Sequence, residues 1–222
     1  MLTGNWLKII GAIAMTLDHI GVMLYPQNDV LRIIGRIAMP IFAYMIAEGC
    51  GHTKNKFRYF ITMFLVAAFC QGVYYFTQNS LEQCILVTFC LSILLIYTYD
   101  IVAKSKNIFA TVLFLICAVF CFYVCEYLPH SIKGFSIDYG FLGVLLPLLV
   151  YAGKNRTDKL MLSIVGMLIL AWHIGGNQLY SLLSLPFLML YNGKRGKKKM
   201  KYFFYIYYPL HLAVIHLISY IV

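Results

Sequence analysis

Two ionisable residues stand side by side in an otherwise apolar stretch near the N-terminus, Asp18 and His19. A carboxylate and an imidazole at one depth in an apolar helix suit proton abstraction from an incoming nucleophile, with the imidazole as the base. Neighbouring helical residues point about 100° apart, so both side chains cannot face one partner. The pair therefore predicts a base oriented by an acid, or two separate contacts. A polar clamp between this stretch and Arg36 is the structural alternative.

A second polar set recurs at a spacing of four in the next apolar stretch, which places its members along one face of a helix. The set comprises Arg32, Arg36, Pro40, Tyr44, Glu48 and His52. Such a stripe predicts a polar cavity or a groove against another helix. Pairing Arg36 with Asp18 is the least costly way to bury both charges. Pro40 interrupts the backbone hydrogen bonds near the middle of the stretch, and the freed carbonyls need protein or water.

The outer members of that stripe also have simpler explanations. Arg32 is able to extend toward the lipid headgroups, and Glu48 with His52 is able to form an interfacial pair. A third polar group lies near the C-terminus, where His211 follows Pro209 and Tyr207. His211 is compatible with a functional role and with an inert, hydrogen-bonded histidine.

The rest of the chain is strongly apolar. Of its 222 residues, 62% are hydrophobic and 12% are charged, and the mean hydropathy is +0.80. A soluble domain carries roughly 25% charged residues, and one of this composition would expose large apolar patches. The composition excludes a soluble globular protein, a disordered chain and a disulfide-stapled secreted module. An integral membrane protein remains, in which ionisable residues within the spans are costly and indicate function.

Apolar runs separated by turn-like polar segments predict about nine transmembrane helices. The expected spans are 6–25, 30–50, 57–76, 83–99, 108–127, 139–152, 160–173, 178–191 and 202–221. Three of these runs are short, so eight or ten spans are the alternatives. We expect an all-α, polytopic membrane helix bundle that forms a single domain over residues 1–222. No cleavable signal peptide is expected, because Asp18 and His19 interrupt the first apolar run.

The Lys and Arg residues that give the chain its formal net charge of +10 are unevenly distributed over the loops between the predicted spans. When the loops are numbered alternately, all but three of the 18 Lys and Arg residues lie on one side. The exceptions are Lys133, Arg32 and Arg36. Because short basic loops mark the cytoplasmic side, we expect the N-terminus inside and, with nine spans, the C-terminus outside. The excess charge thus encodes orientation, and no nucleic-acid partner is expected.

The seven cysteines lie in or at the ends of apolar runs, without a C-x-x-C motif or a Cys/His cluster at metal spacing. They are interpreted as small buried hydrophobic residues, and no metal is expected.

Several stretches resemble the TraX family, the F-pilin acetylase family. They are Leu-Lys-Ile-Ile at 7–10, Leu-Asp-His-Ile-Gly at 17–21, the segment 31–43 with its Gly-Arg-Ile-Ala-x-Pro-x-Phe motif, its continuation at 47–49 and 52–53, and Tyr-Tyr-Pro-Leu-His-Leu at 207–212. The matches lie at both ends of the chain. The middle, 75–135, matches only in hydropathy.

The resemblance implies a relative of the large transmembrane acyltransferase group, which includes the acyltransferase-three proteins and the lysosomal heparan acetyltransferases. Such proteins move an acyl group, usually acetyl from cytosolic acetyl-CoA, to an acceptor on the far side of the membrane. In related enzymes a membrane histidine is the expected catalytic group, and that role falls here on His19, with Asp18 and Arg36 beside it. Arg36 and Glu48 would shape the acyl-CoA tunnel or orient the pair, and His211 would support them.

An acetyl thioester is already activated, so its transfer needs a base for the acceptor and a polar pocket for the developing oxyanion. We therefore expect an acetyl-CoA-dependent O- or N-acetyltransferase in a bacterial-type inner (cytoplasmic) membrane, with a peptide, glycan or small-molecule acceptor. The expected substrate- and acyl-CoA-binding residues are Glu48, Tyr44, His52, Tyr207, His211, Lys54 and Arg58. Candidates for the CoA phosphates are Lys54, Lys56, Arg58, Lys154, Arg156 and the cluster 194–201, although topology alone accounts for most of them.

Two other functions fit the same polar residues. A small-solute transporter would use the stripe along the second span as its pathway. A scaffold without catalytic activity would use the polar residues only to hold helices together.

Overall fold

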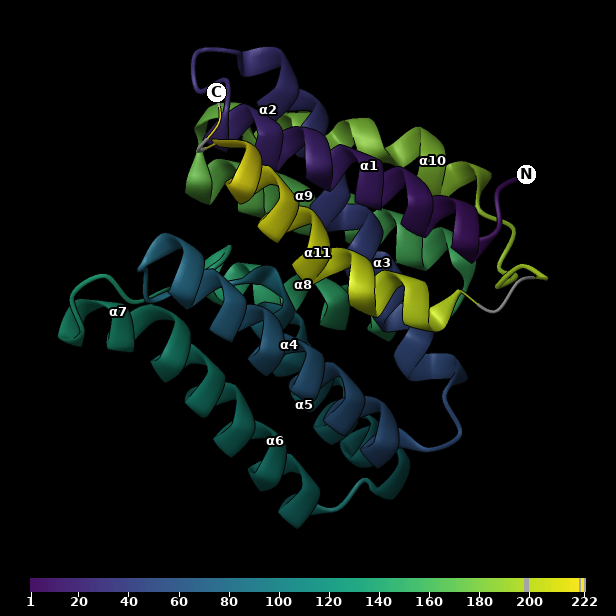
Figure 1. Ribbon diagram of the computed structural model, residues 1–222. Coiled ribbons are helices and arrows are strands. Elements are labelled where there is room, and N and C mark those ends of the chain that lie inside the picture. Colours follow the sequence, from purple (N-terminus) through teal and green to yellow (C-terminus); the bar gives the residue numbers. More distant parts are fainter. Residues whose placement is uncertain (198–199, 220, 222) are drawn as a thin grey trace. The chain divides into compact units, whose positions relative to one another are not determined.

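The computed structural model describes residues 1–197, 200–219 and 221 and shows an all-α protein (Figure 1). Within the described residues, six helices are long and apolar enough to cross a membrane. They are Gly4–Met23, Asp29–His52, Lys56–Phe76, Ile85–Ser105, Ile108–Ser131 and Arg156–Ile174. Gly140–Ala152 and Phe203–Ser219 are shorter apolar helices. The chain is thus a multi-pass membrane protein, while the nine spans and the orientation of the termini stay predictions.

The chain divides into two compact units, which are described separately. Unit 1 comprises Met1–Met45 and Arg156–Val222, and unit 2 comprises Ile46–Asn155. Helix α3 (Ala38–His52) contributes residues to both units. The expectation of one domain over residues 1–222 stays a prediction.

Unit 1 is built from helices at the two ends of the chain. Besides the first part of α3, its elements are α1 (Gly4–Met23), α2 (Asp29–Gly35), α9 (Arg156–Ile174), the 3-10 helix η2 (Gly176–Ser184), α10 (Leu185–Leu190) and α11 (Lys201–Ser219). Helix α1 packs against α2 and α11, while η2 packs against α9 and α2. The N-terminal motif therefore lies against segments from both ends of the sequence.

Glycines set the close contact between α1 and α2. A Cβ atom on Gly35 would overlap the side chain of Asp18, and one on Gly21 would lie 3.0 Å from Leu31 Cβ. Small residues let the backbones of membrane helices approach closely. As a result, the Asp18 carboxylate reaches the polar face of α2.

The second apolar stretch is interrupted within its length. Helix α2 ends at Gly35, Arg36 and Ile37 form a turn, and α3 begins at Ala38. Pro40 lies in the first turn of α3, where its missing N–H and its ring are tolerated. The expected interruption near Pro40 is therefore present, about one turn before the proline itself. It divides the predicted stripe between two helices and leaves Arg36 in the gap.

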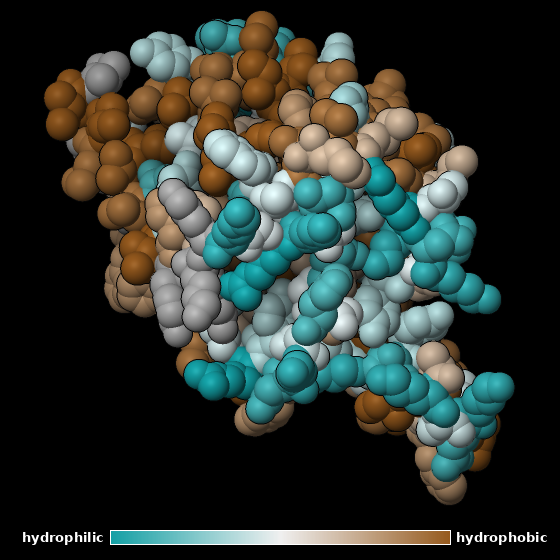
Figure 2. Space-filling view, turned by 90° about the vertical axis from the view of Figure 1, so that its right-hand side faces the viewer, coloured by the Kyte–Doolittle hydropathy of each residue, from teal (hydrophilic) through white to brown (hydrophobic). Residues whose placement is uncertain are grey.

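Basic segments meet at one end of unit 1. The backbone N–H of Gly4 donates to the Lys194 carbonyl at 2.8 Å, and the Arg156 side chain donates to the Met189 carbonyl. Figure 1 shows the N-terminus beside the connection that follows α10, and Figure 2 shows hydrophilic side chains gathered on that face. Unit 1 thus brings together basic loops that the charge distribution predicts to lie on the same side of the membrane.

Unit 2 is centred on one helix, α5. Its elements besides the end of α3 are α4 (Lys56–Gln78), α5 (Ile85–Ser105), α6 (Ile108–Phe122), the π-helical turn η1 (Tyr123–Tyr127), α7 (Leu128–Ser131) and α8 (Gly140–Ala152). Helix α5 packs against α4, α6 and α8. The two-residue strands β1 (Glu82–Gln83) and β2 (Ser136–Ile137) pair in parallel, with Glu82 opposite Ser136.

Hydrogen bonds from polar side chains connect the elements of unit 2. Ser92 Oγ donates to the Val144 carbonyl at 2.8 Å, and both residues are completely buried. Glu126 in η1 accepts a hydrogen bond from the N–H of Phe141 at 2.9 Å, in the first turn of α8. Buried hydroxyl and carboxylate groups need such partners in an apolar medium.

Candidate functional site

Asp18 holds two arginines at the contact between α1 and α2. Arg32 Nη1 lies 2.9 Å from Asp18 Oδ2, and Arg36 Nη2 lies 2.8 Å from Asp18 Oδ1. The side chains of Asp18 and Arg36 are 18% and 14% exposed. The predicted Asp18–Arg36 pair is therefore present, and Arg32 joins it. Because both carboxylate oxygens bind arginines, these charge-assisted bonds fix α2 against α1.

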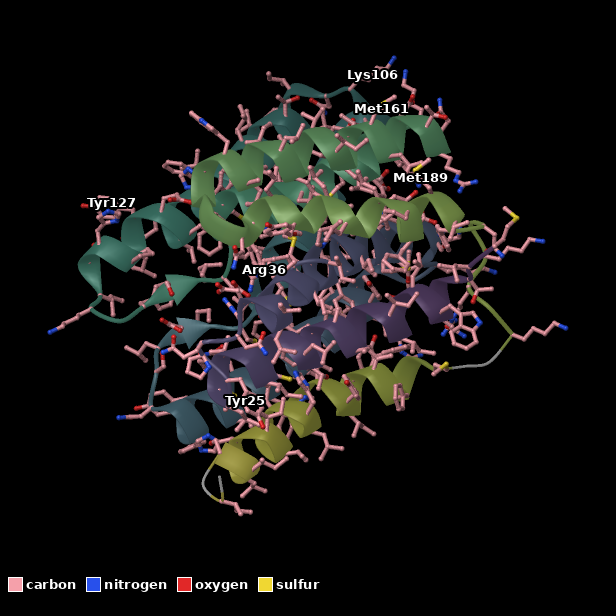
Figure 3. All side chains as sticks on the ribbon, turned by 90° about the horizontal axis from the view of Figure 1, so that it is seen from above. Tyr25, Arg36, Lys106, Tyr127, Met161 and Met189 are labelled. Carbon is pink, nitrogen blue, oxygen red and sulfur yellow. The ribbon has the colours of Figure 1, made fainter. Side chains whose placement is uncertain are left out.

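Arg36 is held by further contacts around the break between α2 and α3. Its Nε donates to the Arg32 carbonyl at 3.4 Å, and its Nη1 donates to Gln178 Oε1 at 3.4 Å. Gln178 lies on η2 and is only 2% exposed. Figure 3 shows Arg36 among the helices of unit 1. The guanidinium thus ties three elements together: α1, α2 and η2.

The bonding partners of His19 indicate its tautomer. Its Nδ1 lies 2.8 Å from the Met15 carbonyl oxygen, one turn back along α1. A carbonyl only accepts, so Nδ1 carries the hydrogen, and this assignment follows from the bonding partners. The other nitrogen, Nε2, then keeps its lone pair, and it forms no hydrogen bond with any of the described residues. A neutral imidazole in this state is able to accept a proton.

His211 on α11 lies behind the His19 ring. Its Nε2 is 3.4 Å from His19 Nδ1, and the ring centroids are 5.0 Å apart. Its Nδ1 is 3.1 Å from the Tyr207 carbonyl, so Nδ1–H donates there and Nε2 is left as an acceptor toward His19. His211 is 6% exposed. The two histidines therefore form a directed pair that leaves His19 Nε2 available.

Tyr207 connects α11 to α1 on the same side as the histidine pair. Its hydroxyl lies 2.5 Å from Thr16 Oγ1 and 3.3 Å from the Ala12 carbonyl. Its ring stacks on the ring of His211, with centroids 5.3 Å apart. The sequence reasoning did not single out Thr16. Its spacing of three from His19 was the available signal, since residues three apart lie on neighbouring parts of a helix face.

The resulting arrangement combines a neutral base with a field of fixed charges. The Asp18 carboxylate and the guanidiniums of Arg32 and Arg36 all lie close enough to His19 to interact with it electrostatically. Nearby cations favour negative charge that develops during a reaction, particularly where the surroundings are apolar. This cluster, defined by Thr16, Asp18, His19, Arg32, Arg36, Gln178, Tyr207 and His211, is the candidate site.

Three predicted residues of α3 lie outside this cluster. Tyr44 is 2% exposed and packs edge-to-face on Tyr191, with ring centroids 5.9 Å apart. Glu48 and His52 belong to unit 2, where Glu48 Oε2 lies 4.0 Å from His52 Nδ1. The His52 side chain is 70% exposed. Their roles in acyl-CoA binding stay predictions.

The basic residues predicted for CoA phosphates are distributed over both units. Lys54 and Arg58 are exposed in unit 2, where the Arg58 N–H donates to Asn55 Oδ1 at 2.8 Å as α4 begins. Lys198 and Lys199 of the predicted cluster lie outside the described residues. Phosphate binding by these residues stays a prediction.

Unit 2 contains a charged cluster that the sequence reasoning missed. Asp100 is 9% exposed and binds Lys56, and Lys104 Nζ lies 2.9 Å from the same carboxylate. The Tyr151 hydroxyl donates to Asp100 Oδ1 at 3.3 Å, and Lys56 lies over the ring of Tyr97. The signal for Asp100–Lys104 was their spacing of four, which favours a pair on a helix.

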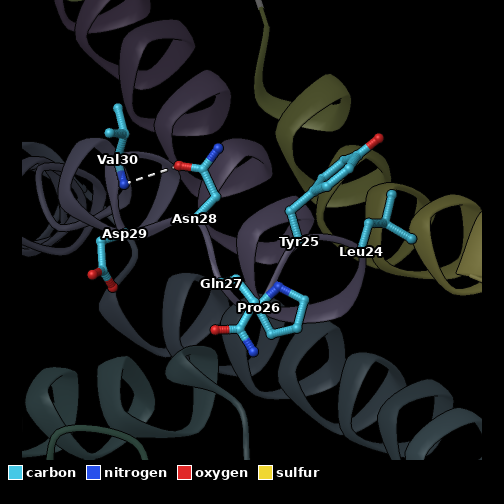
Figure 4. A pocket seen from close by; sticks show the side chains of 7 residues that line it. All are labelled: Leu24, Tyr25, Pro26, Gln27, Asn28, Asp29 and Val30. Carbon is cyan, nitrogen blue, oxygen red and sulfur yellow. Dashed lines mark hydrogen bonds between the residues drawn. The ribbon is translucent and has the colours of Figure 1, made fainter.

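An open hollow lies at the connection between α1 and α2. Figure 4 shows its lining, which runs from Leu24 to Val30, and the hydrogen bond of 3.1 Å from the Val30 N–H to Asn28 Oδ1. The candidate-site residues do not line it. Among the described residues, no group of three or more His, Cys, Asp or Glu side chains is placed to hold a metal ion. All seven cysteines are free, and six are buried.

Comparison with known proteins decides the family. The family model described as TraX protein matches residues 3–219. The chain belongs to the TraX family. The resemblance found in the motifs at both ends is therefore confirmed, and it extends through the middle of the chain.

Two relatives of this TraX-family chain differ in how much they cover. An uncharacterized protein of Rickettsia prowazekii is 60% identical over 38 residues, which is 17% of this chain and 15% of the relative. A probable fimbrial assembly protein, FimC of serogroup H1, from Dichelobacter nodosus is 23% identical over 234 aligned positions, which cover 94% of this chain and 92% of the relative. No solved structure gives a significant match.

Proposed function

We propose that this TraX-family chain is a membrane-embedded acetyltransferase with His19 as its general base. It transfers acetyl from cytosolic acetyl-CoA to an amine or hydroxyl of an acceptor at or beyond the outer face of the cell membrane. The observation that carries the proposal is the Nδ1–H bond of His19 to the Met15 carbonyl, which leaves Nε2 as a proton acceptor. Membership of the TraX family and the fimbrial-assembly description of a relative support a pilin-related acceptor.

The proposed chemistry needs one base and one site for developing charge. The acceptor nitrogen or oxygen attacks the thioester carbonyl, and its proton passes to His19 Nε2. A new C–N or C–O bond forms as the C–S bond breaks. The CoA thiolate leaves and takes the proton from the imidazolium, which returns His19 to its neutral state. The nearby guanidiniums favour the oxyanion of the tetrahedral intermediate.

The other members of the site act on this base. His211 and the Met15 carbonyl orient the His19 ring, because they occupy the Nδ1 side. Asp18 is a positioning residue, since its oxygens hold Arg32 and Arg36. An orienting bond from Asp18 to His19, one of the two sequence-based alternatives, is therefore not part of the proposal.

Purified protein in proteoliposomes tests the proposal. Radiolabelled acetyl-CoA is supplied on one side of the bilayer, and a synthetic pilin amino-terminal peptide is enclosed on the other. For the wild type we expect labelled peptide inside the vesicles. For His19→Gln we expect the transfer rate to fall by at least about 100-fold, since general-base catalysis contributes roughly 10²–10⁴-fold.

The matched control is His216→Gln on α11, which removes a histidine outside the candidate site. We expect His216→Gln to transfer acetyl at the wild-type rate. The proposal is wrong if wild-type vesicles with verified folded protein transfer no label to the amine peptide or to a hydroxyl-bearing acceptor, or if His19→Gln is as active as the control.

The broken second span supports transport as a second candidate function. Discontinuous helices with polar residues at the break are typical of transporter binding sites, and Arg36 lies in such a break. Saturable solute flux through the same proteoliposomes, without acetyl transfer, would favour this alternative.

A further inference from the structure

One face of α1 carries both a basic residue and the histidine of the candidate site. Lys8 and His19 are eleven residues apart in the sequence. Because this spacing is close to three full helical turns, their side chains project from the same face of α1, and Thr16 lies on that face between them. With a rise of about 1.5 Å per residue, the two positions are separated by about 16 Å along the helix axis.

Helix α11 runs beside this face of α1 (Figure 1). Near the start of α11, the ring of Phe204 lies below the Lys8 ammonium, with 5.8 Å between Nζ and the ring centroid. About one turn later the Tyr207 hydroxyl contacts Thr16, and the ring pair with His19 follows. The α1–α11 contact, defined by these pairs, therefore extends from Lys8 to His19.

A short backbone pairing fixes the Lys8 end of this contact. The N–H of Asn5, in the first turn of α1, donates to the Arg195 carbonyl at 3.0 Å. Together with the bond from Gly4 to Lys194, it satisfies donors that a helix N-terminus leaves free. The pairing places Arg195 close enough to Lys8 for their charges to interact.

Lys8 and Arg195 form a pair of like charges. Within the part of the chain that the structure describes, neither residue forms an ion pair. Lys8 is half-buried and Arg195 is exposed. Two neighbouring cations at the end of a helix contact attract anions. A basic cytoplasmic side accounts for the presence of both residues, but it does not account for the alignment of Lys8 with His19.

We propose that Lys8 and Arg195 bind the diphosphate of acetyl-CoA, and that its pantetheine arm lies along the α1–α11 contact with the thioester at His19. An extended chain advances about 1.2 Å per bond, so the arm of about 13 bonds from phosphorus to sulfur reaches about 16 Å. This reach matches the axial separation of Lys8 and His19. The hydroxyls of Thr16 and Tyr207 lie along the path and suit the amide groups of the arm. The inference rests on the proposed function for the identity of the acyl donor.

Thermal unfolding of the full chain in dodecyl maltoside, a detergent without phosphate, tests the diphosphate site. One arm adds coenzyme A. The other adds phosphatidylglycerol, because a phospholipid headgroup is a second source of phosphate, and sodium chloride keeps the ionic strength constant. Since a ligand of the folded state stabilises it, we expect coenzyme A to raise the Tm saturably, by about 5–10 °C at about a hundred times Kd. A rise with phosphatidylglycerol and none with coenzyme A would overturn the proposal.

Substitutions of the two cations locate the site. Lys8→Gln and Arg195→Gln should each raise the apparent Kd for coenzyme A about tenfold or more, because each removes a charge-assisted contact. Lys8→Arg keeps the charge and should bind as the wild type does. Lys133→Gln, which removes an exposed positive charge in unit 2, is the matched control and should leave the Kd unchanged. The proposal is wrong if the folded Gln variants of Lys8 and Arg195, verified by their Tm without ligand, bind as this control does.

A cysteine at position 19 tests where the sulfur end of the arm lies. His19→Cys is treated with the 2-pyridyl disulfide of coenzyme A, whose pyridyl thiol leaves as the protein–coenzyme disulfide forms, and intact-protein mass detects the product. Ile13→Cys is the matched control, since Ile13 is exposed on a different face of α1. The wild type, with seven free cysteines of which six are buried, gives the background.

We expect labelling of His19→Cys to saturate with concentration and to fall about tenfold when Lys8→Gln is added, in proportion to the lost binding. Labelling of Ile13→Cys should not depend on Lys8. Saturable binding of coenzyme A without labelling at position 19 would overturn the placement of the arm. Neither measurement needs acetyl transfer, so an inactive wild type that binds and is labelled as described contradicts the proposed function alone.

Discussion

Gly35→Ala is expected to destabilise the protein even though alanine is the better helix former. A Cβ atom on Gly35 would overlap the Cβ, Cγ and Oδ1 atoms of Asp18. Rotation of the carboxylate would relieve only part of this overlap, because Asp18 Cβ is fixed by the backbone of α1. The two helices must therefore move apart, which lengthens the bonds from Asp18 to Arg32 and Arg36.

The magnitude follows from opposing effects. Alanine in a helix favours the folded state over glycine by about 1 kcal/mol. Two charge-assisted hydrogen bonds contribute about 1.5–3 kcal/mol each when buried, and their partial exposure lowers that figure. We expect a net loss of about 2–3 kcal/mol, or a fall in Tm of about 5–10 °C for a chain of this size. Thermal unfolding in detergent, followed by circular dichroism, measures it.

Gly72→Ala is the matched control for this substitution. Gly72 lies in α4, and a Cβ atom there would have no heavy atom of the described residues within 4 Å apart from the backbone of its own helix. We expect Gly72→Ala to leave the Tm unchanged or slightly raised, because only helix propensity changes. If Gly35→Ala is as stable as Gly72→Ala, the close contact that brings Asp18 to α2 is not as described.

Five further substitutions at three polar contacts are tested by the same unfolding measurement. Asp18→Asn should cost about 3–5 kcal/mol, because it removes the carboxylate that binds both guanidiniums; a stability equal to wild type would contradict the ion pairs. Thr16→Val should cost about 1 kcal/mol through its lost contact with the Tyr207 hydroxyl, and Tyr207→Phe should add little to it. Asp100→Asn should destabilise clearly more than Lys104→Met, because the Lys104 side chain is 71% exposed and such exposed partners contribute little. Equal effects would argue against the buried position of Asp100.

The hydropathy of the chain predicted its membrane helices, and the cost of burying single charges predicted one contact of the candidate site. Apolar runs long enough to cross a membrane must become helices there, because every backbone polar group needs an internal partner. The Asp18–Arg36 pair followed from the cost of leaving either charge alone in such a helix. These inferences depend only on composition and local spacing.

The parts that escaped prediction depend on which helices meet. A spacing of four placed Arg32, Arg36 and Glu48 on one face, but the break at Arg36–Ile37 divides that face between two helices. Spacing along one helix also gives no sign that Gln178 on η2 reaches Arg36. The glycine at position 35 appeared in a motif without a role, because its role is the space that it leaves for Asp18.

Chemical rescue tests the central claim, that His19 Nε2 is the base for acetyl transfer, most directly. His19→Ala should lose about 100-fold or more in acetyl transfer, and added imidazole should restore part of that rate while leaving the His216→Ala control unchanged. Rescue by imidazole separates a proton acceptor from a residue that only supports the fold. Wild-type activity in His19→Ala that needs no imidazole would contradict the account.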